Sequence, residues 1–163
     1  MAEIPAALVR ELRQKTNAGM MDCKKALSET AGDMESAVDW LRKAGVLAAA
    51  RKADRATTEG LVGVAGTGYS AAMVEVSTET DFLARHKAFQ QFVRTLAELL
   101  LTSKTGNMSE VHTLIYPGTD RTVSEELTSM MATNGENIQL CRTCFLSVCD
   151  GVVASYVHNA IAP

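Results

Sequence analysis

The period of the apolar residues changes at about residue 59, and this change constrains the fold more than any other feature of the sequence. Before residue 59, apolar residues recur every three or four positions, as they do on one face of a helix. After it come "GLVGVAG" and "SAAMVEVS", short runs of small and β-branched residues that are typical of strands. Helices and strands that occupy separate stretches of a chain favour an α+β fold.

Residues 1–45 are predicted to form a module of three short helices, because breaks at Asn17–Gly19 and at Gly32 divide the helical pattern. Asp33 follows the second break and is expected to cap the third helix. Alanine-rich residues 46–58 are then expected to form a helical linker, since alanine has the highest helix propensity.

The second of these helices has an apolar face that we expect to be buried. Met20, Cys23 and Leu27 lie three and four positions apart along it.

Residues 59–163 are predicted to form a core subdomain, an antiparallel sheet with helices packed on one face. A hairpin should come first, followed by a helix from Thr80 to Leu101 and another that starts with a capping box formed by Thr122 and Glu125. A second hairpin is expected to turn at Asp150–Gly151, a dipeptide that fits a two-residue turn.

Composition and charge indicate an ordinary soluble, intracellular protein. Hydrophobic residues make up 47% of the 163 residues and the net charge is −3, which argues against a general binder of nucleic acids. The apolar runs are far shorter than the roughly 18 residues of a membrane span. The amphipathic N-terminus contains acids and is not a targeting peptide. We expect a cytoplasmic protein, or an organellar one if a transit peptide has been removed.

The four cysteines are expected to be buried structural thiols. Cys141 and Cys144 form a C-x-x-C motif within a predicted strand rather than at a helix N-terminus, where thiol chemistry is favoured. The three histidines offer no spacing that would complete a zinc site. A metal or redox site built on Cys141, Cys144 and Cys149 is the alternative.

The sequence lacks the common catalytic motifs, including the phosphate-binding P-loop, G-x-S-x-G and H-E-x-x-H. Glu75, Glu79 and Asp81 alternate along an extended segment and could form a carboxylate site, but a solvated strand end is the favoured explanation. The pattern therefore favours a binding protein over an enzyme.

Asp81 and Phe82 stand together where a strand gives way to a helix. Thr80 already fits the position of the helix cap, which leaves Asp81 without that role. Phe82 lies two turns before Phe89 and could continue the buried face of the helix, or it could point outward.

Two stretches resemble the elongation factor Ts family. "TNAGMMDCKKAL" (16–27) is similar to the motif of the family's N-terminal module, and "VEVSTETDFLAR" (74–85) to its strand followed by T-D-F-[VL]-A. "NGENI" (134–138) and "SYVH" (155–158) are similar to later landmarks of the family, in the same order. The resemblance covers nearly the whole chain and is weakest over 103–133.

The resemblance implies a guanine-nucleotide exchange factor that binds elongation factor Tu with GDP and promotes GDP release, with no catalytic group or cofactor of its own. The expected fold is a three-helix module like the ubiquitin-associated domain, followed by the sheet core. Asp81 and Phe82 would enter the partner near its magnesium and phosphate site. A helical interaction module without exchange activity is the alternative.

The resemblance implies further contacts with the partner. In the N-terminal module these are Thr16, Met20, Met21, Asp22 and Lys24, of which Met20 could equally be a core residue. Weaker candidates are Asn134, Gly135 and His158, the last of which could also have a purely structural role.

Family members commonly continue beyond the point that corresponds to Pro163, so we expect this chain to be a truncated form. If it is complete, the resemblance implies a minimal protein that pairs with a second copy.

Overall fold

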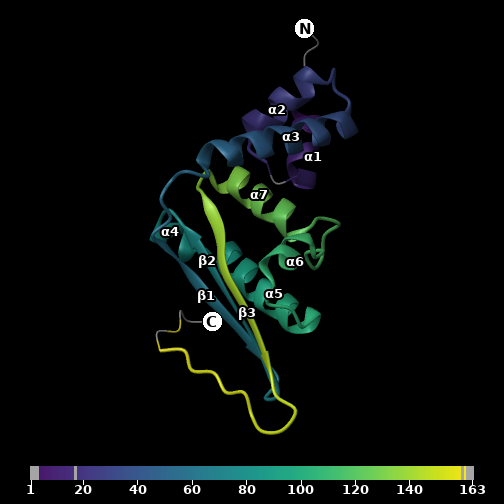
Figure 1. The fold of residues 1–163 in the computed structure, drawn as a ribbon. Coiled ribbons are helices and arrows are strands. Elements are labelled where there is room, and N and C mark those ends of the chain that lie inside the picture. The colour runs from purple at the N-terminus through teal and green to yellow at the C-terminus, as the bar shows by residue number, and fades with distance from the viewer. Residues whose placement is uncertain (1–3, 17, 159, 161–163) are drawn as a thin grey trace. The chain divides into compact units, whose positions relative to one another are not determined.

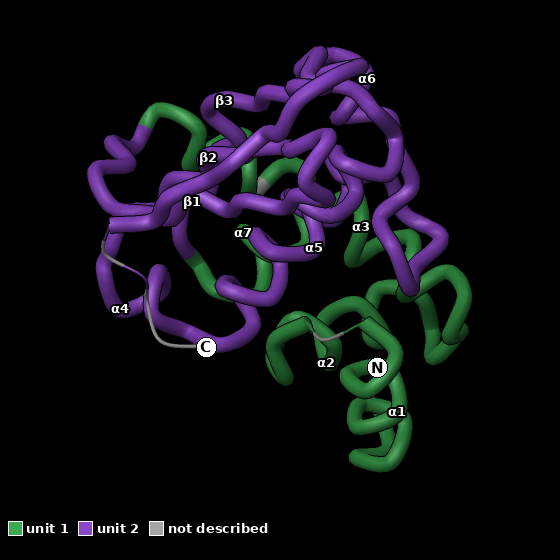
Figure 2. Tube along the Cα trace, turned by 90° about the horizontal axis from the view of Figure 1, so that it is seen from below, with its two compact units in different colours: residues 1–54, 128–135 green, residues 55–127, 136–163 purple. Residues whose placement is uncertain are grey.

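The computed structural model describes residues 4–16, 18–158 and 160, and the chain divides into two compact units (Figures 1 and 2). The first unit comprises Met1–Asp54 and Thr128–Gly135, and the second comprises Arg55–Leu127 and Glu136–Pro163. The elements in chain order are α1 (Ala6–Thr16), α2 (Met20–Glu29), α3 (Met34–Lys52), β1 (Glu59–Gly66), β2 (Ser70–Thr78), α4 (Asp81–Ala84), α5 (Lys87–Ser103), α6 (Met108–Thr113), α7 (Val123–Asn134) and β3 (Ile138–Ser147).

The first unit has its own apolar core between α1, α2 and α3. Its fully buried members include Leu12, Cys23 and Leu27, as the spacing predicts for the last two. Met20 was expected on the same face, but its side chain is 59% exposed, because it is the first residue of α2 and lies beyond the packed stripe. The predicted break between α1 and α2 includes Asn17, which lies outside the described residues.

Helix α3 is one continuous helix that runs through much of the segment expected to be a linker. Asp33 caps it as predicted, since its carboxylate accepts a hydrogen bond of 2.8 Å from the Ser36 amide. The helix continues to Lys52 because alanine-rich sequence with high helix propensity follows Gly45. At its end, the Lys52 ammonium donates a hydrogen bond of 3.1 Å to the Met131 carbonyl in α7.

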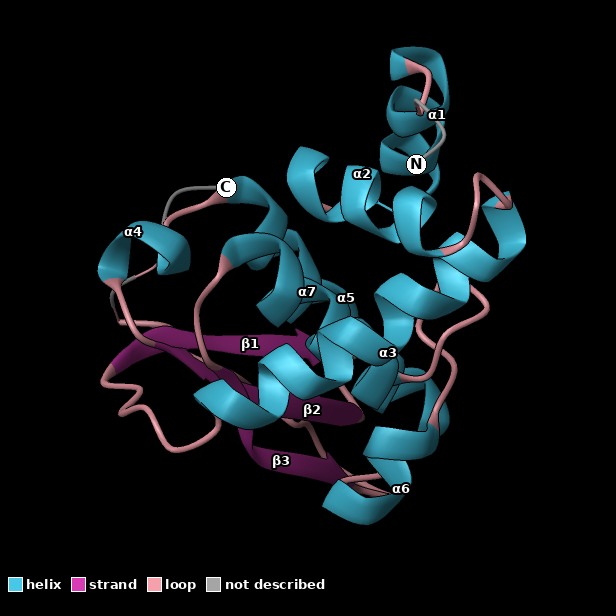
Figure 3. Ribbon diagram, turned by 90° about the horizontal axis from the view of Figure 1, so that it is seen from above, coloured by secondary structure: helices cyan, strands magenta, loops and turns pink. Residues whose placement is uncertain are grey.

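The second unit is built on an antiparallel sheet, which confirms the predicted α+β class. In the described part of the chain the strand order is β1-β2-β3. Helix α5 covers one face of the sheet, where Ala72, Val74 and Val76 of β2 are buried (Figures 1 and 3). The backbone of α5 comes so close to β1 that a Cβ atom at Gly63 would lie 2.8 Å from the Val93 carbonyl oxygen.

The helix predicted from Thr80 to Leu101 is interrupted and forms α4 and α5. The interruption falls at Arg85 and His86, and His86 has an extended conformation with φ −71° and ψ 131°. The predicted apolar stripe of α5 is buried, with Phe89, Leu96 and Leu100 inaccessible to solvent. Because of this break, the residues of the one-turn helix α4 do not continue the buried face of α5.

The capping box predicted for α7 is present. The Thr122 amide donates to the Glu125 carboxylate at 2.9 Å, and the Glu125 amide donates to the Thr122 hydroxyl at 3.2 Å.

The predicted second hairpin is wrong, because the described residues 148–158 contain no strand after β3. The chain bonds instead to the β1–β2 turn, where the amides of Val148 and Val153 donate to the carbonyls of Tyr69 and Gly68 at 2.9 and 2.7 Å. Asp150–Gly151 does turn the chain, but turn chemistry alone does not provide the ladder of bonds a strand needs.

The expectation of buried thiols is correct for Cys23 and wrong for Cys141, Cys144 and Cys149, which are exposed. These three lie in or just after β3, an edge strand whose outward face is not covered by the helices. Cys141 is the extra residue of a bulge, since Leu140 pairs with Val76 and Arg142 with Glu75.

Among the described residues, no helix is long and apolar enough to cross a membrane.

Candidate functional site

Asp81 and Phe82, here called the tip, form the start of α4 and project from the second unit. The Thr80 hydroxyl caps the helix by accepting a hydrogen bond of 3.3 Å from the Leu83 amide. The inner side of the turn is buried, with Leu83 4% and Ala84 5% exposed, whereas Phe82 is 79% exposed. Phe82 therefore does not continue the buried stripe of Phe89.

A shallow, open hollow lies around the tip and is mostly lined by residues that can carry charge. Its lining residues are Asp81, Phe82, Arg85, His86 and Lys87. The Asp81 carboxylate lies 3.4 Å from the Arg85 guanidinium in an exposed ion pair. Such pairs are weak in water, so Arg85 orients Asp81 but leaves it available to another cation.

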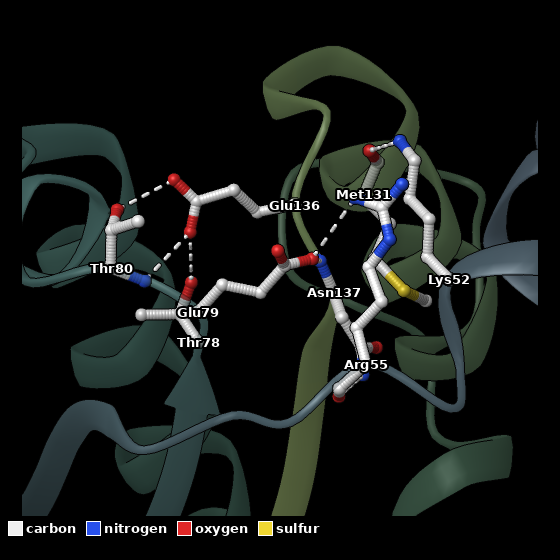
Figure 4. A network of polar contacts seen from close by, with 8 residues as sticks. All are labelled: Lys52, Arg55, Thr78, Glu79, Thr80, Met131, Glu136 and Asn137. Atoms are coloured by element: carbon white, nitrogen blue, oxygen red, sulfur yellow. Dashed lines mark hydrogen bonds and ion pairs between the residues drawn. The ribbon is translucent and has the colours of Figure 1, made fainter.

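Immediately before the tip, the chain is held by the carboxylate of Glu136 (Figure 4). One oxygen accepts hydrogen bonds from the Thr78 hydroxyl at 2.9 Å and from the Thr80 amide at 3.0 Å. The other oxygen accepts from the Thr80 hydroxyl at 2.6 Å. Bonds to a charged acceptor are about twice as strong as those between neutral groups.

A second carboxylate, that of Glu79, connects the same two segments in the opposite direction, from residues 78–80 to Asn137. Glu79 accepts a hydrogen bond of 2.6 Å from the Asn137 amide and lies 3.5 Å from the Arg55 guanidinium. The Asn137 side chain, which is 1% exposed, donates to the Arg55 carbonyl at 2.8 Å. We refer to the reciprocal contacts of residues 78–80 with Glu136 and Asn137 as the clamp.

The electrostatics of the clamp favour an ionised Glu136. Partial burial alone would raise the pKa of its carboxyl group, but hydrogen bonds from Thr80 and Thr78 outweigh this effect and leave the pKa below its ordinary value. The clamp is therefore intact at neutral pH.

The carboxylates that alternate in sequence do not form a common site. Glu75 pairs with Arg142 across the strands, Glu79 with Arg55, and Asp81 with Arg85. Within the described residues, no cluster of three or more histidine, cysteine, aspartate or glutamate side chains has the arrangement of a metal site.

The candidate residues of the N-terminal motif lie in the first unit. Met21 is 74% exposed, as the first turn of α2 turns both of its methionines outward. Asp22 and Lys24 are exposed. Thr16 is half-buried, and its hydroxyl donates to the Leu12 carbonyl at 2.7 Å.

The weaker candidates are exposed as well. The Asn134 side chain donates to the Met130 carbonyl at 2.9 Å, and Gly135 follows with a φ of 79° that closes α7. In the second unit, the His158 ring nitrogen lies 2.9 Å from the Tyr156 hydroxyl.

Sequence reasoning missed the clamp. Glu136 and Asn137 belong to the segment "NGENI", but their partners among residues 78–80 lie 56 to 58 residues away in the chain. A local pattern does not encode such a pairing. The feature of the sequence that could have indicated the clamp is a pair of polar segments, 77–81 between β2 and α4 and 134–137 between α7 and β3.

The tip, and all of the clamp except Thr78, lie within the part of the chain that matches a known family. The profile described as "Elongation factor TS" matches residues 79–162. The chain belongs to the elongation factor Ts family. Among its relatives named elongation factor Ts, the protein of Rhodospirillum centenum is 56% identical over 164 residues and that of Rhizobium johnstonii is 52% identical over 162 residues.

These alignments include 100% and 99% of this chain but 53% and 52% of the two relatives. The chain thus spans about half the length of the elongation factor Ts proteins it matches.

Proposed function

We propose that this chain binds elongation factor Tu and promotes the release of GDP from it, as a cytoplasmic guanine-nucleotide exchange factor of translation. The observation that carries the proposal is the tip, an aromatic side chain that is 79% exposed on a helix whose other face is buried. Leaving a phenylalanine in water forgoes about 1.5–3 kcal/mol of burial. Buried aromatic anchors commonly dominate the energy of protein interfaces.

An exchange factor needs no reactive group, because it works by binding one state of its partner more tightly than another. If it lowers GDP affinity about a thousandfold, its contacts must differ between the two states by about 4 kcal/mol. The coupling is reciprocal, so GDP lowers the affinity for the exchange factor by the same factor.

The chemistry of the tip suits this task. Phe82 would enter between packed elements of the nucleotide domain, where an inserted ring forces a rearrangement. Asp81 would compete for polar groups around the magnesium ion. Loss of that ion removes the charge that neutralises the phosphates of GDP and so weakens nucleotide binding.

The N-terminal motif would add affinity rather than exchange. The exposed methionines of α2 are flexible and polarisable, and such side chains adapt to apolar surfaces. Exposed Lys24 would provide a charged contact at the rim. Pairing with a second copy of the chain stays a prediction.

The test is the rate at which a fluorescent GDP leaves elongation factor Tu, with and without micromolar amounts of this chain. Acceleration that saturates with its concentration supports the proposal. Binding to Tu without any acceleration would instead support the interaction module, and the absence of both would contradict the proposal.

A further inference from the structure

We propose that Glu136 is a positioning residue for Asp81 and Phe82, because its carboxylate fixes the segment from which they project. The inference rests on the proposed function, since it concerns how the tip is presented to a partner. Glu136 itself would not touch that partner or its nucleotide.

The connection between β2 and α4 is short, so small changes in it redirect the tip. Glu79 and Thr80 alone separate the last residue of β2 from the first residue of α4. The Glu136 carboxylate bonds to the residues on both sides of Glu79, at the Thr78 hydroxyl and at the amide and hydroxyl of Thr80 (Figure 4). It therefore holds the backbone at the point where the strand turns into the helix.

The tip needs this support because α4 has four residues. A single helical turn is unstable in isolation, since nucleation fixes several residues for one hydrogen bond. Burial of Leu83 and Ala84 secures one side of the turn, but Phe82 has 79% of its surface in solvent and gains little from packing. The cap at Thr80 and the carboxylate that holds Thr80 supply the remaining restraint.

Restraint before binding matters for an inserting side chain. A segment that is already ordered loses less conformational entropy when a partner closes on it, and this saving appears as tighter binding. A negative acceptor is suited to the task because it takes three hydrogen bonds that water would otherwise compete for. The Thr78 hydroxyl is fully buried, so removal of the carboxylate would leave it without this acceptor.

The test uses Glu136→Ala in the whole chain and the fluorescent GDP assay. We expect the acceleration of GDP release to fall about tenfold. The matched control is Glu110→Ala, which also removes a carboxylate that accepts a threonine hydroxyl, at 2.6 Å from Thr105 on an exposed part of the second unit. Its acceleration should stay within about twofold of the original chain.

Conservative variants provide rescue and protect the test against misfolding. Glu136→Gln keeps one neutral acceptor oxygen and should retain more acceleration than Glu136→Ala. Thr80→Ser keeps the hydroxyl and should behave like the original chain, whereas Thr80→Val should lose about as much as Glu136→Ala.

A combined mutant separates positioning from general destabilisation. If Glu136 acts by placing Asp81 and Phe82, then Glu136→Ala should lower the residual acceleration by less than about twofold in a background that already carries Asp81→Asn and Phe82→Ala. A full tenfold loss in that background would overturn the proposal, because Glu136 would then act independently of the tip.

A measurement without the partner distinguishes failure of this inference from failure of the proposed function. Amide hydrogen exchange over residues 79–86 should be faster in Glu136→Ala than in Glu110→Ala, with other segments unchanged. Unchanged exchange there, or unchanged GDP release when Phe82→Ala is impaired, would overturn the positioning role. A chain that fails to accelerate GDP release at all contradicts the proposed function. In that case the amide hydrogen exchange of residues 79–86 still decides whether Glu136 orders the tip.

Discussion

The two candidate contact regions both place apolar side chains in the first turn of a helix, yet they are held very differently. At α4, Thr80 caps the helix and Glu136 fixes the residues before it. At α2, Gly19 occupies the cap position and provides no side-chain cap hydrogen bond. The difference indicates a restrained wedge in the second unit and an adaptable surface in the first.

This contrast suggests a division of labour. An aromatic ring on a restrained turn resists displacement and can force a partner to rearrange. Methionines on an uncapped turn follow the shape of whatever they meet and contribute area without imposing geometry. We therefore expect changes at the tip to alter the maximal rate of GDP release, and changes at α2 to alter affinity.

The largest effect is expected for Phe82→Ala. Loss of the inserted ring should reduce the maximal acceleration of GDP release about 100-fold, comparable with a strong interface hot spot. Tyr69→Ala is the matched control, since this aromatic is 66% exposed at the β1–β2 turn of the same unit. If Phe82→Ala and Tyr69→Ala reduced the acceleration of GDP release equally, Phe82 would have no special role compared with another exposed aromatic residue of the same unit.

A smaller loss, about 30-fold, is expected for Asp81→Asn, which keeps the shape of the side chain and removes its charge. The measurement is GDP release at low and high magnesium concentration. The variant should be most impaired when magnesium is abundant, because the carboxylate is proposed to compete for the ligands of that ion. Asp150→Asn, at an exposed turn, should release GDP like the original chain.

Replacement of Met20 and Met21 by alanine should weaken binding to elongation factor Tu about tenfold and change the maximal rate less than threefold. Titration of the acceleration against concentration measures both quantities. Leu47→Ala on α3, also an exposed apolar residue of the first unit, serves as control. A reduced maximal rate at saturation would show that α2 takes part in displacing the nucleotide.

The smallest effect concerns the clamp and pH. Because hydrogen bonds lower the pKa of Glu136, its carboxylate stabilises the fold above its ordinary value of 4.5, and this contribution is lost as the pH falls through the lower folded value. At pH 7, Glu136→Gln should reduce the free energy of unfolding by about 1 kcal/mol. The difference from the original chain should shrink below pH 4.5.

Urea unfolding followed by circular dichroism measures this difference, while fluorescence of Trp40, the single tryptophan, reports on the first unit. Glu110→Gln controls for the loss of an exposed charge. A difference that grows in acid would contradict a lowered pKa for the Glu136 carboxyl group in the folded chain.

The sequence predicted the features that depend on local periodicity and capping. The buried face of α5, the Asp33 cap and the Thr122–Glu125 capping box follow from spacing within a few residues, and the structure confirms them. The hairpin of β1 and β2 was recognised for the same reason.

Features that depend on distant partners were not predictable in this way. Residues 152–158 include the β-type residues Val152, Val153 and Tyr156. A strand nevertheless exists only where a neighbour supplies its hydrogen bonds, and here the chain bonds to the β1–β2 turn instead. The role of Glu136 depends on residues more than 50 positions earlier. Exposure of Phe82 followed from family resemblance, because periodicity alone allowed it to be core.

The close approach at Gly63 has a consequence for how the molecule tolerates change. There, one added carbon atom would lie 2.8 Å from the Val93 carbonyl oxygen, so the backbone of β1 or α5 would have to shift. Substitutions at Phe82 disturb no such packing, because the residue is largely exposed to solvent. Architecture and recognition are thus governed by separate positions, and variants with a new partner preference can arise without any loss of the scaffold that presents them.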